Sequence, residues 1–267
     1  MSEPDLDALA EAYERGLAAE KAGQTEAAAE AYRACLALDP EDRGGAAVRL
    51  ASLGLGPAPE RAPPAYVATL FDQHADSFEM TLVHALGYAI PDVIADRLVD
   101  LDLGPFRRGL DLGCGTGLVA EAMEGRVTAW DGVDLAEEML ALAEEKELYA
   151  GLYVGDAEAF VTEAAPASYD LIVAADVLPY LGALEPLIES AGRALAPGGI
   201  IALSTEAGAG GGDWGVGPHQ RFWHDPAYVT RVLAAAGIVM RAVTPETIRD
   251  ERGVPVPGHL LIGAKRS

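Results

Sequence analysis

The sequence predicts an α/β fold, namely a doubly wound, mostly parallel seven-stranded sheet preceded by a small α-helical segment. Two observations carry this prediction. From about residue 105 onward, short apolar runs alternate with helical segments, and the run at 169–175 is apolar enough for a strand buried on both faces. Repeats of strand and helix at this spacing imply parallel strands joined by right-handed crossovers. A chain of 267 residues has room for one large domain and an appendage.

Composition and charge argue against several classes of protein. The chain has 42 acidic and 19 basic residues and a net charge of -23, so nucleic acids and anionic membranes are not expected partners. No apolar run is long enough to span a bilayer, and the acidic N-terminus does not resemble a signal peptide. The two cysteines, Cys35 and Cys114, form no disulfide framework, and no Cys/His cluster has zinc spacing. We expect a cytoplasmic protein without a metal.

Residues 1–54 are expected to form a helical segment. The helical pattern of 5–39 breaks at Gly23, and a further helix is expected near 44–54. The spacing of Gly16, Gly23, Ala28, Tyr32 and Pro40 resembles one tetratricopeptide (TPR) repeat. Because arrays of such repeats normally need about three copies, a helical hairpin packed on the main domain and a peptide-binding array remain alternatives. Such a segment can also mediate a homodimer or recruit a protein partner.

Residues 55–64 are predicted to be a linker, because prolines and glycines leave no room there for a regular element. We place the domain boundary at this linker. Helices are expected to cap the domain over 65–104, and the α/β core is expected over 105–267. The expected strands of the core are 108–112, 126–134, 152–154, 169–175, 200–204, 238–243 and 260–264.

A glycine-rich turn follows the first strand, in Asp111-Leu-Gly-Cys-Gly-Thr-Gly117. Glycines let backbone lie against a ligand, and the start of a helix offers free N–H groups. Leu118 stands where the dinucleotide fingerprint requires glycine, which argues against NAD or FAD, and no Walker motif is present. The turn resembles the first motif of class I S-adenosylmethionine (SAM)-dependent methyltransferases. The resemblance covers about 66–264, extends to a branch of the family with TPR-like helices, and implies SAM as cofactor and S-adenosylhomocysteine (SAH) as product.

Acidic residues end the next two strands. In a doubly wound sheet the ligand lies at the carboxyl ends of the strands, so Asp134 and Asp156 are candidate binding residues. Asp134 follows Asp111 by 23 residues, a spacing at which a carboxylate can bind ribose hydroxyls. For either acid alone, capping of the next helix is the alternative role. The resemblance assigns the ribose to Asp134, the adenine face to Leu135 and the adenine amino group to Asp156. The cofactor-binding candidates are Tyr88, Asp111, Gly113, Cys114, Gly115, Gly117, Asp134, Leu135, Met139, Asp156, Ala157, Ala175, Asp176 and Val177.

The acceptor side is predicted from the chain after the fifth strand. Residues 206–218 contain six glycines and are predicted to form a mobile lid, with Trp214 as its aromatic anchor. The next stretch resembles an Arg-Phe-x-His segment of the repeat-bearing methyltransferases, and histidine is the usual base near neutral pH. An arginine pair would recognise an acidic acceptor bidentately. We name Tyr180, Arg221 and His224 as catalytic candidates and Tyr66, His74, Trp214, His219 and Arg249 as substrate-binding candidates.

The sequence is therefore interpreted as that of an enzyme that transfers a methyl group from SAM to O or N of a small molecule. The protein would act mainly by holding the acceptor in line with the methyl group, with a histidine as possible base. After the fourth strand the chain reads Ala175-Asp-Val-Leu-Pro-Tyr180, unlike the Asn/Asp-Pro-Pro-Tyr/Phe motif of enzymes that methylate nucleic-acid amino groups. A non-catalytic SAM-binding regulator or scaffold, recruiting a partner through the N-terminal helices, is the alternative. A protein methyltransferase is the third interpretation.

Overall fold

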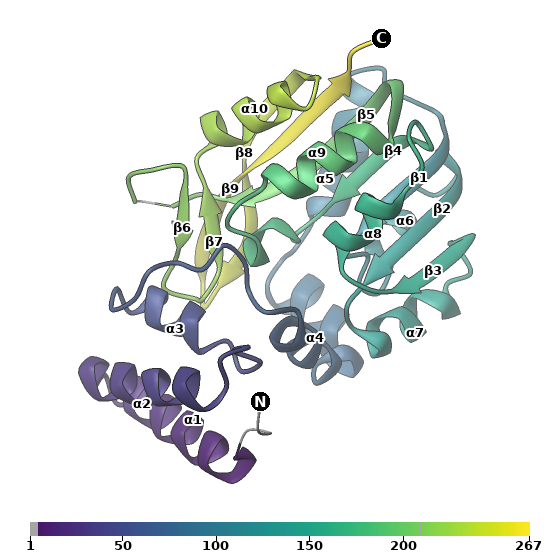
Figure 1. Ribbon diagram of the computed structural model, residues 1–267. Coiled ribbons are helices and arrows are strands. Elements are labelled where there is room, and N and C mark those ends of the chain that lie inside the picture. Colours follow the sequence, from purple (N-terminus) through teal and green to yellow (C-terminus); the bar gives the residue numbers. More distant parts are fainter. Residues whose placement is uncertain (1–4, 209) are drawn as a thin grey trace.

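The central sheet is mostly parallel and has helices on both faces (Figure 1). The computed structural model describes residues 5–208 and 210–267. Five parallel strands lie in the order β3, β2, β1, β4 and β5, followed by the antiparallel β9 and then β8. These seven strands confirm the predicted fold class. They are β1 (Phe106–Leu112), β2 (Val127–Asp134), β3 (Gly151–Val154), β4 (Tyr169–Ala174), β5 (Leu195–Glu206), β8 (Ile238–Glu251) and β9 (Val254–Lys265).

Both faces of the sheet are covered, which explains the unbroken apolar sequence of its central strands. Along β4, Ile172 and Ala174 pack on one face while Leu171 and Val173 pack on the other, as the alternation of a strand requires. The first face meets α8 (Ala157–Glu163), α9 (Glu185–Ala194) and α10 (Pro226–Ala235). The second meets α5 (Ile90–Asp100) and α6 (Leu118–Ala122). The helix α7 (Glu137–Glu145) follows β2.

The register of the sheet brings the carboxyl ends of the parallel strands to one edge. Leu112 of β1 pairs with Val133 of β2, and Asp134 of β2 pairs with Val154 of β3. The glycine turn after β1 therefore lies beside the acids that end β2 and β3. This edge is where a ligand site is expected in a doubly wound sheet.

A short hairpin corrects the prediction of a mobile lid at 206–218. β6 (Trp214–Val216) lies within this range and pairs antiparallel with β7 (Phe222–His224) beyond it, and β7 joins the end of β5. The indole of Trp223 occupies the space that side chains would need, because a Cβ at Gly208 or Gly210 would lie 2.2 Å or 2.5 Å from it. The glycines therefore wrap an aromatic ring.

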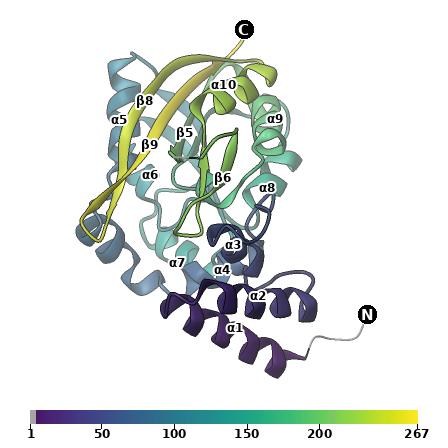
Figure 2. The same ribbon diagram turned by 90° about the vertical axis from the view of Figure 1, so that its left-hand side faces the viewer.

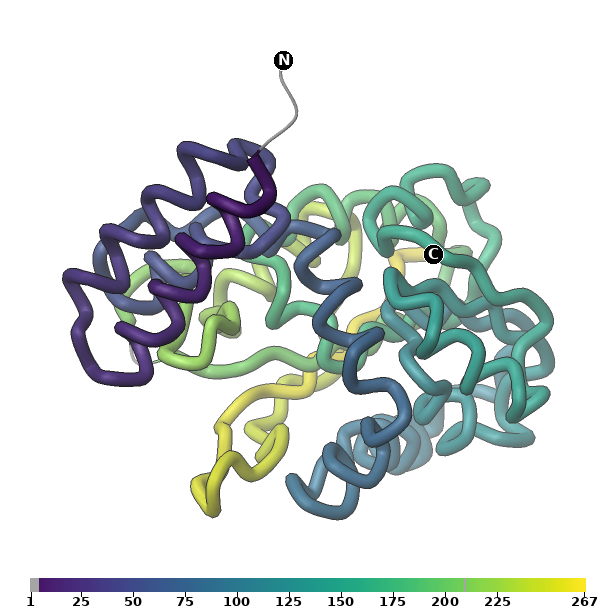
Figure 3. Tube along the Cα trace, turned by 90° about the horizontal axis from the view of Figure 1, so that it is seen from below, coloured from purple at the N-terminus to yellow at the C-terminus, as the bar shows by residue number. Residues whose placement is uncertain are grey.

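The cap over the cavity edge is less regular than the sequence predicted. The helix α4 (Pro64–Asp72) is followed by a 3₁₀ turn at Ala75–Ser77 and a single stretch of π-helix at Met80–Ala85, before α5 begins. The backbone N–H of Asp250, near the tip of the β8–β9 pair, donates to the carbonyl of Leu86 at 2.6 Å. Figure 3 shows this yellow tip beside the blue segment.

The N-terminal segment is a helical hairpin with a short third helix, formed by α1 (Leu6–Lys21), α2 (Thr25–Leu38) and α3 (Ala46–Ser52). Gly16 lets the two long helices approach, because a Cβ there would lie 2.5 Å from the ring of Tyr32. Arg49 of α3 donates to the Tyr13 hydroxyl at 3.0 Å and pairs with Glu20 at 3.0 Å, which ties α3 to α1. In Figure 2 these helices lie below the main domain, with α3 nearest to it.

The proline-rich linker lies against the main domain. The Glu60 carbonyl accepts from the N–H groups of Gly182 and Ala183 at 2.7 Å and 3.0 Å, and the Ala62 N–H donates to the Tyr180 carbonyl at 2.8 Å. These bonds hold the segment 60–62 alongside 180–183. Among the described residues, no helix is long and apolar enough to cross a membrane.

The N-terminal helices also touch the hairpin. The side-chain amide of Gln220 donates to the Ser52 hydroxyl at 3.2 Å, and Val48 of α3 belongs to the same apolar cluster as Tyr180 and Phe222. The N-terminal segment therefore packs beside the residues predicted for the acceptor side.

Candidate functional site

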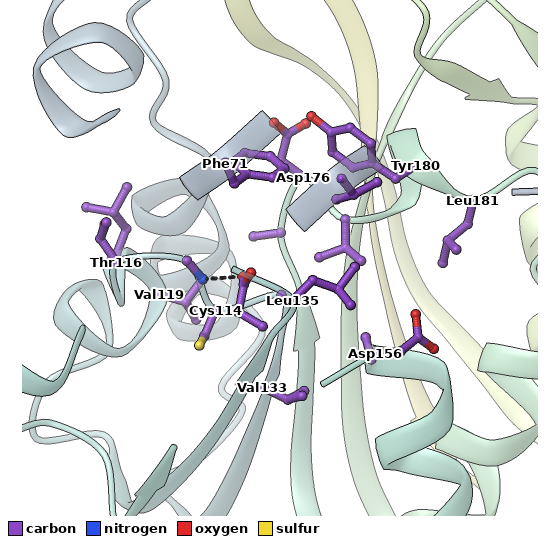
Figure 4. A pocket seen from close by; sticks show the side chains of 18 of the residues that line it. Phe71, Cys114, Thr116, Val119, Val133, Leu135, Asp156, Asp176, Tyr180 and Leu181 are labelled. Atoms are coloured by element: carbon purple, nitrogen blue, oxygen red, sulfur yellow. Dashed lines mark hydrogen bonds between the residues drawn. The ribbon is translucent and has the colours of Figure 1, made fainter. Parts of the chain in front are cut away.

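A cavity lies at the carboxyl edge of the sheet (Figure 4), and its volume is about 970 Å³ when its mouth, which is open to solvent, is included. Its floor is the glycine turn and the ends of β2, β3 and β4, and its roof comes from α4, the π-helical stretch and the linker. The predicted site residues that line it are Tyr88, Gly113, Cys114, Gly115, Asp134, Leu135, Asp156, Ala157, Ala175, Asp176, Val177 and Tyr180.

The glycine turn approaches the end of β4 more closely than a side chain would permit. Gly113 has φ of 64°, and a Cβ there would lie 2.4 Å from Cγ2 of Val177. Gly117 has φ of 89° and is the N-cap of α6. The turn thus needs glycine for its backbone angles and for its packing. Gly117 lies just outside the cavity lining.

Asp134 holds the turn in place. Its two carboxylate oxygens accept from the backbone N–H groups of Gly115 at 2.8 Å and of Ala136 at 2.9 Å. Burial raises the pKa of Asp134, while these backbone donors act to lower it. Each oxygen keeps a further lone pair, so the carboxylate can accept two hydrogen bonds from a ligand as well.

Asp111 lies beneath the turn and does not line the cavity, which corrects the expectation of direct contact. It is fully buried, and one of its oxygens accepts from the Tyr149 hydroxyl at 2.7 Å while the other has no partner among the described residues. Burial raises its pKa to about 7. Cys114 lines the cavity while its Sγ packs toward Gly132 of β2, and burial raises the pKa of its thiol. The thiol is therefore protonated at neutral pH.

Arg61 is a site residue that the sequence analysis missed. Its guanidinium pairs with the Asp156 carboxylate and lies 3.8 Å from Glu158, and all three residues line the cavity. Asp156 also caps α8 by accepting from the Ala159 N–H at 3.0 Å. The linker therefore supplies a wall of the cavity at the end of β3. A single arginine in a proline-rich stretch carries no pattern that would have marked it.

Tyr180 and Asp176 form the opposite end of the cavity. Figure 4 shows the Tyr180 hydroxyl beside the Asp176 carboxylate, with Phe71 next to them. The rings of Phe71 and Tyr180 meet edge to face at a centroid distance of 5.5 Å. The Tyr180 hydroxyl is buried without a partner among the described residues, and burial raises its pKa. Tyr180 is therefore a protonated donor, not a base.

The predicted arginine pair is not free to bind an acidic acceptor. Arg249 is fully buried and pairs with Glu206 and Glu251 at 2.7 Å each, and with Asp176 at 3.4 Å. Arg221 also pairs with Asp176, at 3.4 Å, and lies 3.8 Å from Glu206. The expectation of bidentate recognition is therefore wrong, because three carboxylates already occupy the two guanidinium groups.

His224 is turned away from the cavity, which argues against its role as a base. It is 1% exposed, and its Nε2 donates to the Gly182 carbonyl at 3.1 Å. Burial lowers its pKa to about 4. Because it is neutral, inaccessible and hydrogen-bonded to backbone, His224 serves the packing of the hairpin.

The other predicted residues outside the cavity have structural contacts. His74 donates from Nδ1 to the Leu70 carbonyl at 2.7 Å, and His219 is mostly exposed and lies 3.3 Å from Glu251. Tyr66 packs on Gly45, Trp214 packs on Gly182 and Phe222, and Met139 is buried with Ala75, Ala136 and Phe71. The cavity is instead completed by apolar residues that were not predicted as site residues, among them Phe71, Phe78, Leu82 and Leu181.

Comparison with known proteins agrees with this geometry. Residues 110–203 match the family model described as a methyltransferase domain. Over 103 residues, or 37% of this chain, the sequence is 33% identical to a ubiquinone biosynthesis O-methyltransferase of Burkholderia vietnamiensis. The match covers 44% of that protein, so the chain spans less than half the length of the curated relatives it matches.

Two solved structures share the fold over most of this chain. The [4+2]-cyclase SpnF covers 79% of this chain and 98% of its own, with a TM-score of 0.62 and 17% identity. The Burkholderia thailandensis 1,6-didemethyltoxoflavin-N1-methyltransferase, solved with 1,6-didemethyltoxoflavin and SAH, covers 79% and 95%, with a TM-score of 0.57 and 20% identity. At such identities the likeness shows the fold alone, and a cyclase among these structures makes the same point.

The sheet order and the family match together define a class I methyltransferase fold. Residues 110–203 are the part of this fold that matches the methyltransferase domain model. This range contains the glycine turn and the acids that end β2 and β3, while the roof of the cavity lies outside it.

Proposed function

We propose that the protein transfers a methyl group from SAM to O or N of a small-molecule acceptor. One observation carries the proposal: the glycine turn, Asp134 and Asp156 come from three successive strand ends and line a single cavity. The family match over 110–203 supports it as well. Neither a glycine turn nor a strand-end acid is specific alone, but their convergence suits a nucleoside with a polar tail.

The residues present fit SAM. Asp134 has free lone pairs for ribose hydroxyls, and Leu135 offers an apolar face to adenine. Both oxygens of Asp156 already accept hydrogen bonds, but the one that pairs with Nη2 of Arg61 keeps a lone pair for the adenine amino group. The backbone of Gly113 and Gly115 lines the cavity where the methionine end would lie, while its N–H groups donate to the Val133 carbonyl and to Asp134. When bound, SAM supplies a methyl group already activated by its sulfonium. The protein then needs to orient an acceptor and exclude water, for which the apolar roof is suited.

Calorimetry with SAM and SAH, on the wild type and on Asp134→Ala, tests the proposal. Losing two charge-assisted hydrogen bonds at about 1.5 kcal/mol each should weaken binding by about 100-fold or more. The matched control is Asp213→Ala, because Asp213 lies on the surface in an exposed pair with Arg231. Absence of SAM and SAH binding by folded wild-type protein would refute the proposal.

A SAM-binding regulator or scaffold is the second candidate. It is favoured by the contact of Ser52 and Val48 with the hairpin beside the cavity, since a partner on the N-terminal helices could sense ligand there. Transfer of labelled methyl from SAM into the small-molecule or the protein fraction of a cell extract would distinguish an enzyme from a regulator. Label in the protein fraction would favour a protein methyltransferase.

Membership of the TPR-bearing branch, a homodimer or protein partner through the N-terminal helices, and a cytoplasmic location are also proposals. The first two rest on the helical hairpin of α1 and α2. The third is supported by the two free cysteines, Cys35 and Cys114, since proteins of oxidising compartments usually pair their cysteines.

A further inference from the structure

The end of the cavity at β4 has polar side chains that could hydrogen-bond to a ligand. Tyr180 is 8% exposed, lines the cavity and has a buried hydroxyl without a partner among the described residues. A buried hydroxyl left unpaired costs about 1–3 kcal/mol, so a bound molecule is the expected partner. The Asp176 carboxylate lies beside it (Figure 4).

The backbone at Asp176 agrees with a place beside a ligand. Its φ is 58°, in the left-handed region that most residues with a side chain avoid, although aspartate enters it more readily than most. The strained residue is held by its own N–H, which donates to the Ser204 hydroxyl at 2.8 Å. Strain of this kind persists where the surrounding structure enforces it, and it clusters at ligand sites.

The charge around this end excludes an anionic ligand. Arg221 and Arg249 are the nearest cations, and Asp176, Glu206 and Glu251 together outnumber them by one negative charge. Arg249 is buried, Arg221 is half-buried, and neither guanidinium group lines the cavity. An anion entering here would meet a carboxylate without a free cation, at a cost in desolvation and repulsion.

The net charge of the side chains that line the rest of the cavity is also negative. Among its described lining residues the charged side chains are Arg61 and the carboxylates of Asp134, Asp156, Glu158 and Asp176. Arg61 is already paired with Asp156. The remaining surface around Asp176 is apolar and includes Phe71, Phe78 and Leu82.

We propose that Asp176 and Tyr180 bind the methyl acceptor, and that they select a neutral or cationic molecule with an apolar body. This inference rests on the function proposed above and names its substrate class. The reacting O–H or N–H of the acceptor donates to the Asp176 carboxylate, and the Tyr180 hydroxyl donates to a second polar atom of the acceptor. Asp176, assigned from the sequence to the cofactor, is thereby assigned to the acceptor.

The chemistry balances with the residues present. The acceptor heteroatom forms a bond to the methyl carbon, the carbon–sulfur bond breaks, and its electron pair returns to sulfur. The proton released from the acceptor passes to the Asp176 carboxylate and then to water. No oxidant, reductant or metal is needed.

A binding experiment with two defined probes tests the position of Asp176. Sinefungin resembles SAM but carries an ammonium-bearing carbon in place of the methylated sulfur, whereas SAH has no group there. Calorimetry on wild-type protein should show sinefungin binding at least tenfold tighter than SAH, because its ammonium meets Asp176 and the aromatic rings. Asp176→Asn should reduce this ratio to less than threefold and leave SAH affinity within threefold.

The control is Asp213→Asn, the same chemical change at an exposed site, which should keep the wild-type ratio. A ratio unchanged in Asp176→Asn, in protein that binds SAH normally, overturns the inference and leaves the proposed function intact. Failure of the wild type to bind SAH or SAM overturns both.

Acceptor charge is tested with matched phenols in a labelled-methyl assay. Tyramine and 4-ethylphenol are cationic and neutral, while 3-(4-hydroxyphenyl)propionate is the anionic counterpart. Turnover of either of the first two at least tenfold above the propionate supports the inference, and preference for the propionate overturns it. If none is turned over, the same three probes are compared by their binding to SAH-loaded protein. In that comparison the inference is overturned if the propionate binds as tightly as the other two phenols. It is also overturned if none of the three binds.

Discussion

Replacing Arg249 with methionine should destabilise the protein strongly, because it leaves a buried cluster of carboxylates without one of its cations. Arg249 is fully buried and makes contacts of 2.7 Å with Glu206, 2.7 Å with Glu251 and 3.4 Å with Asp176. Removing one partner of a buried ion pair typically costs about 3–5 kcal/mol. Arg221 remains 3.4 Å from Asp176 and 3.8 Å from Glu206, so we expect about 3 kcal/mol.

Urea unfolding and thermal melting measure this loss. At about 2–4 °C per kcal/mol for a chain of this size, the melting temperature should fall by about 6–12 °C. The deficit should depend on pH, because carboxylates without their cation have a raised folded pKa, and burial already raises the pKa of Glu206. A raised folded pKa gives stability that is lost as pH rises, so the difference from wild type should be larger at pH 8 than at pH 5.

The matched control is Arg107→Met. Arg107 lies 3.5 Å from Asp170 but its side chain is 91% exposed, so its loss should hardly change stability. The reasoning is wrong if the free energy of unfolding of Arg249→Met lies within about 1 kcal/mol of the wild-type value. It is also wrong if the loss of stability is larger at pH 5 than at pH 8.

Three further outcomes are expected. His224→Gln should flatten the pH dependence of the free energy of unfolding between about pH 6.5 and 4, measured with urea. In the folded protein the pKa of His224 is lowered to about 4, so the stability that its neutral form contributes is lost as pH falls through that window. An unchanged slope would contradict this. Gly113→Ala should lower both melting temperature and SAM affinity, since the new Cβ would lie 2.4 Å from a methyl group of Val177 and φ is 64°; a native-like crystal structure with wild-type affinity would argue otherwise. Arg61→Ala should weaken SAM binding about fivefold in calorimetry, which is equivalent to about 1 kcal/mol for the loss of a partly exposed pair with Asp156. Arg61→Lys keeps the charge and should recover part of the lost affinity.

The sheet and its binding edge were predictable because their signals are local. Apolar runs, the turn at Gly113 and Gly115, and acids at strand ends can each be recognised within about ten residues of sequence. The parallel register then brings Asp134 and Asp156 beside the turn without further information. This is why most of the predicted cofactor residues line the cavity.

The acceptor side was harder because its contacts span the chain. Arg61 meets Asp156 across 95 positions of sequence, and Arg249 meets Asp176 across 73. A sequence shows that an arginine is present but not that carboxylates already occupy it. His224 was misread for the same reason, since its burial depends on the hairpin and on Gly182.

The glycines of 206–218 show a different limit. Glycine is needed both by a segment that moves and by a segment that wraps a large ring closely. Only the position of the Trp223 indole against Gly208 and Gly210 distinguishes the two. The rarity of π-helix likewise makes Met80–Ala85 unpredictable from helical periodicity.

The place of β9 has a consequence for how the chain folds. Among the described strands β9 is synthesised last, yet it lies inside the sheet, between β5 and β8. Until it emerges from the ribosome, the long edge of β5 has no partner along Ile200–Glu206, and β8 has none at all. Unpaired edges of this length invite pairing with other nascent chains. Completion of the sheet therefore waits for β9, and the yield of folded protein should depend on how well the unfinished sheet is shielded until then.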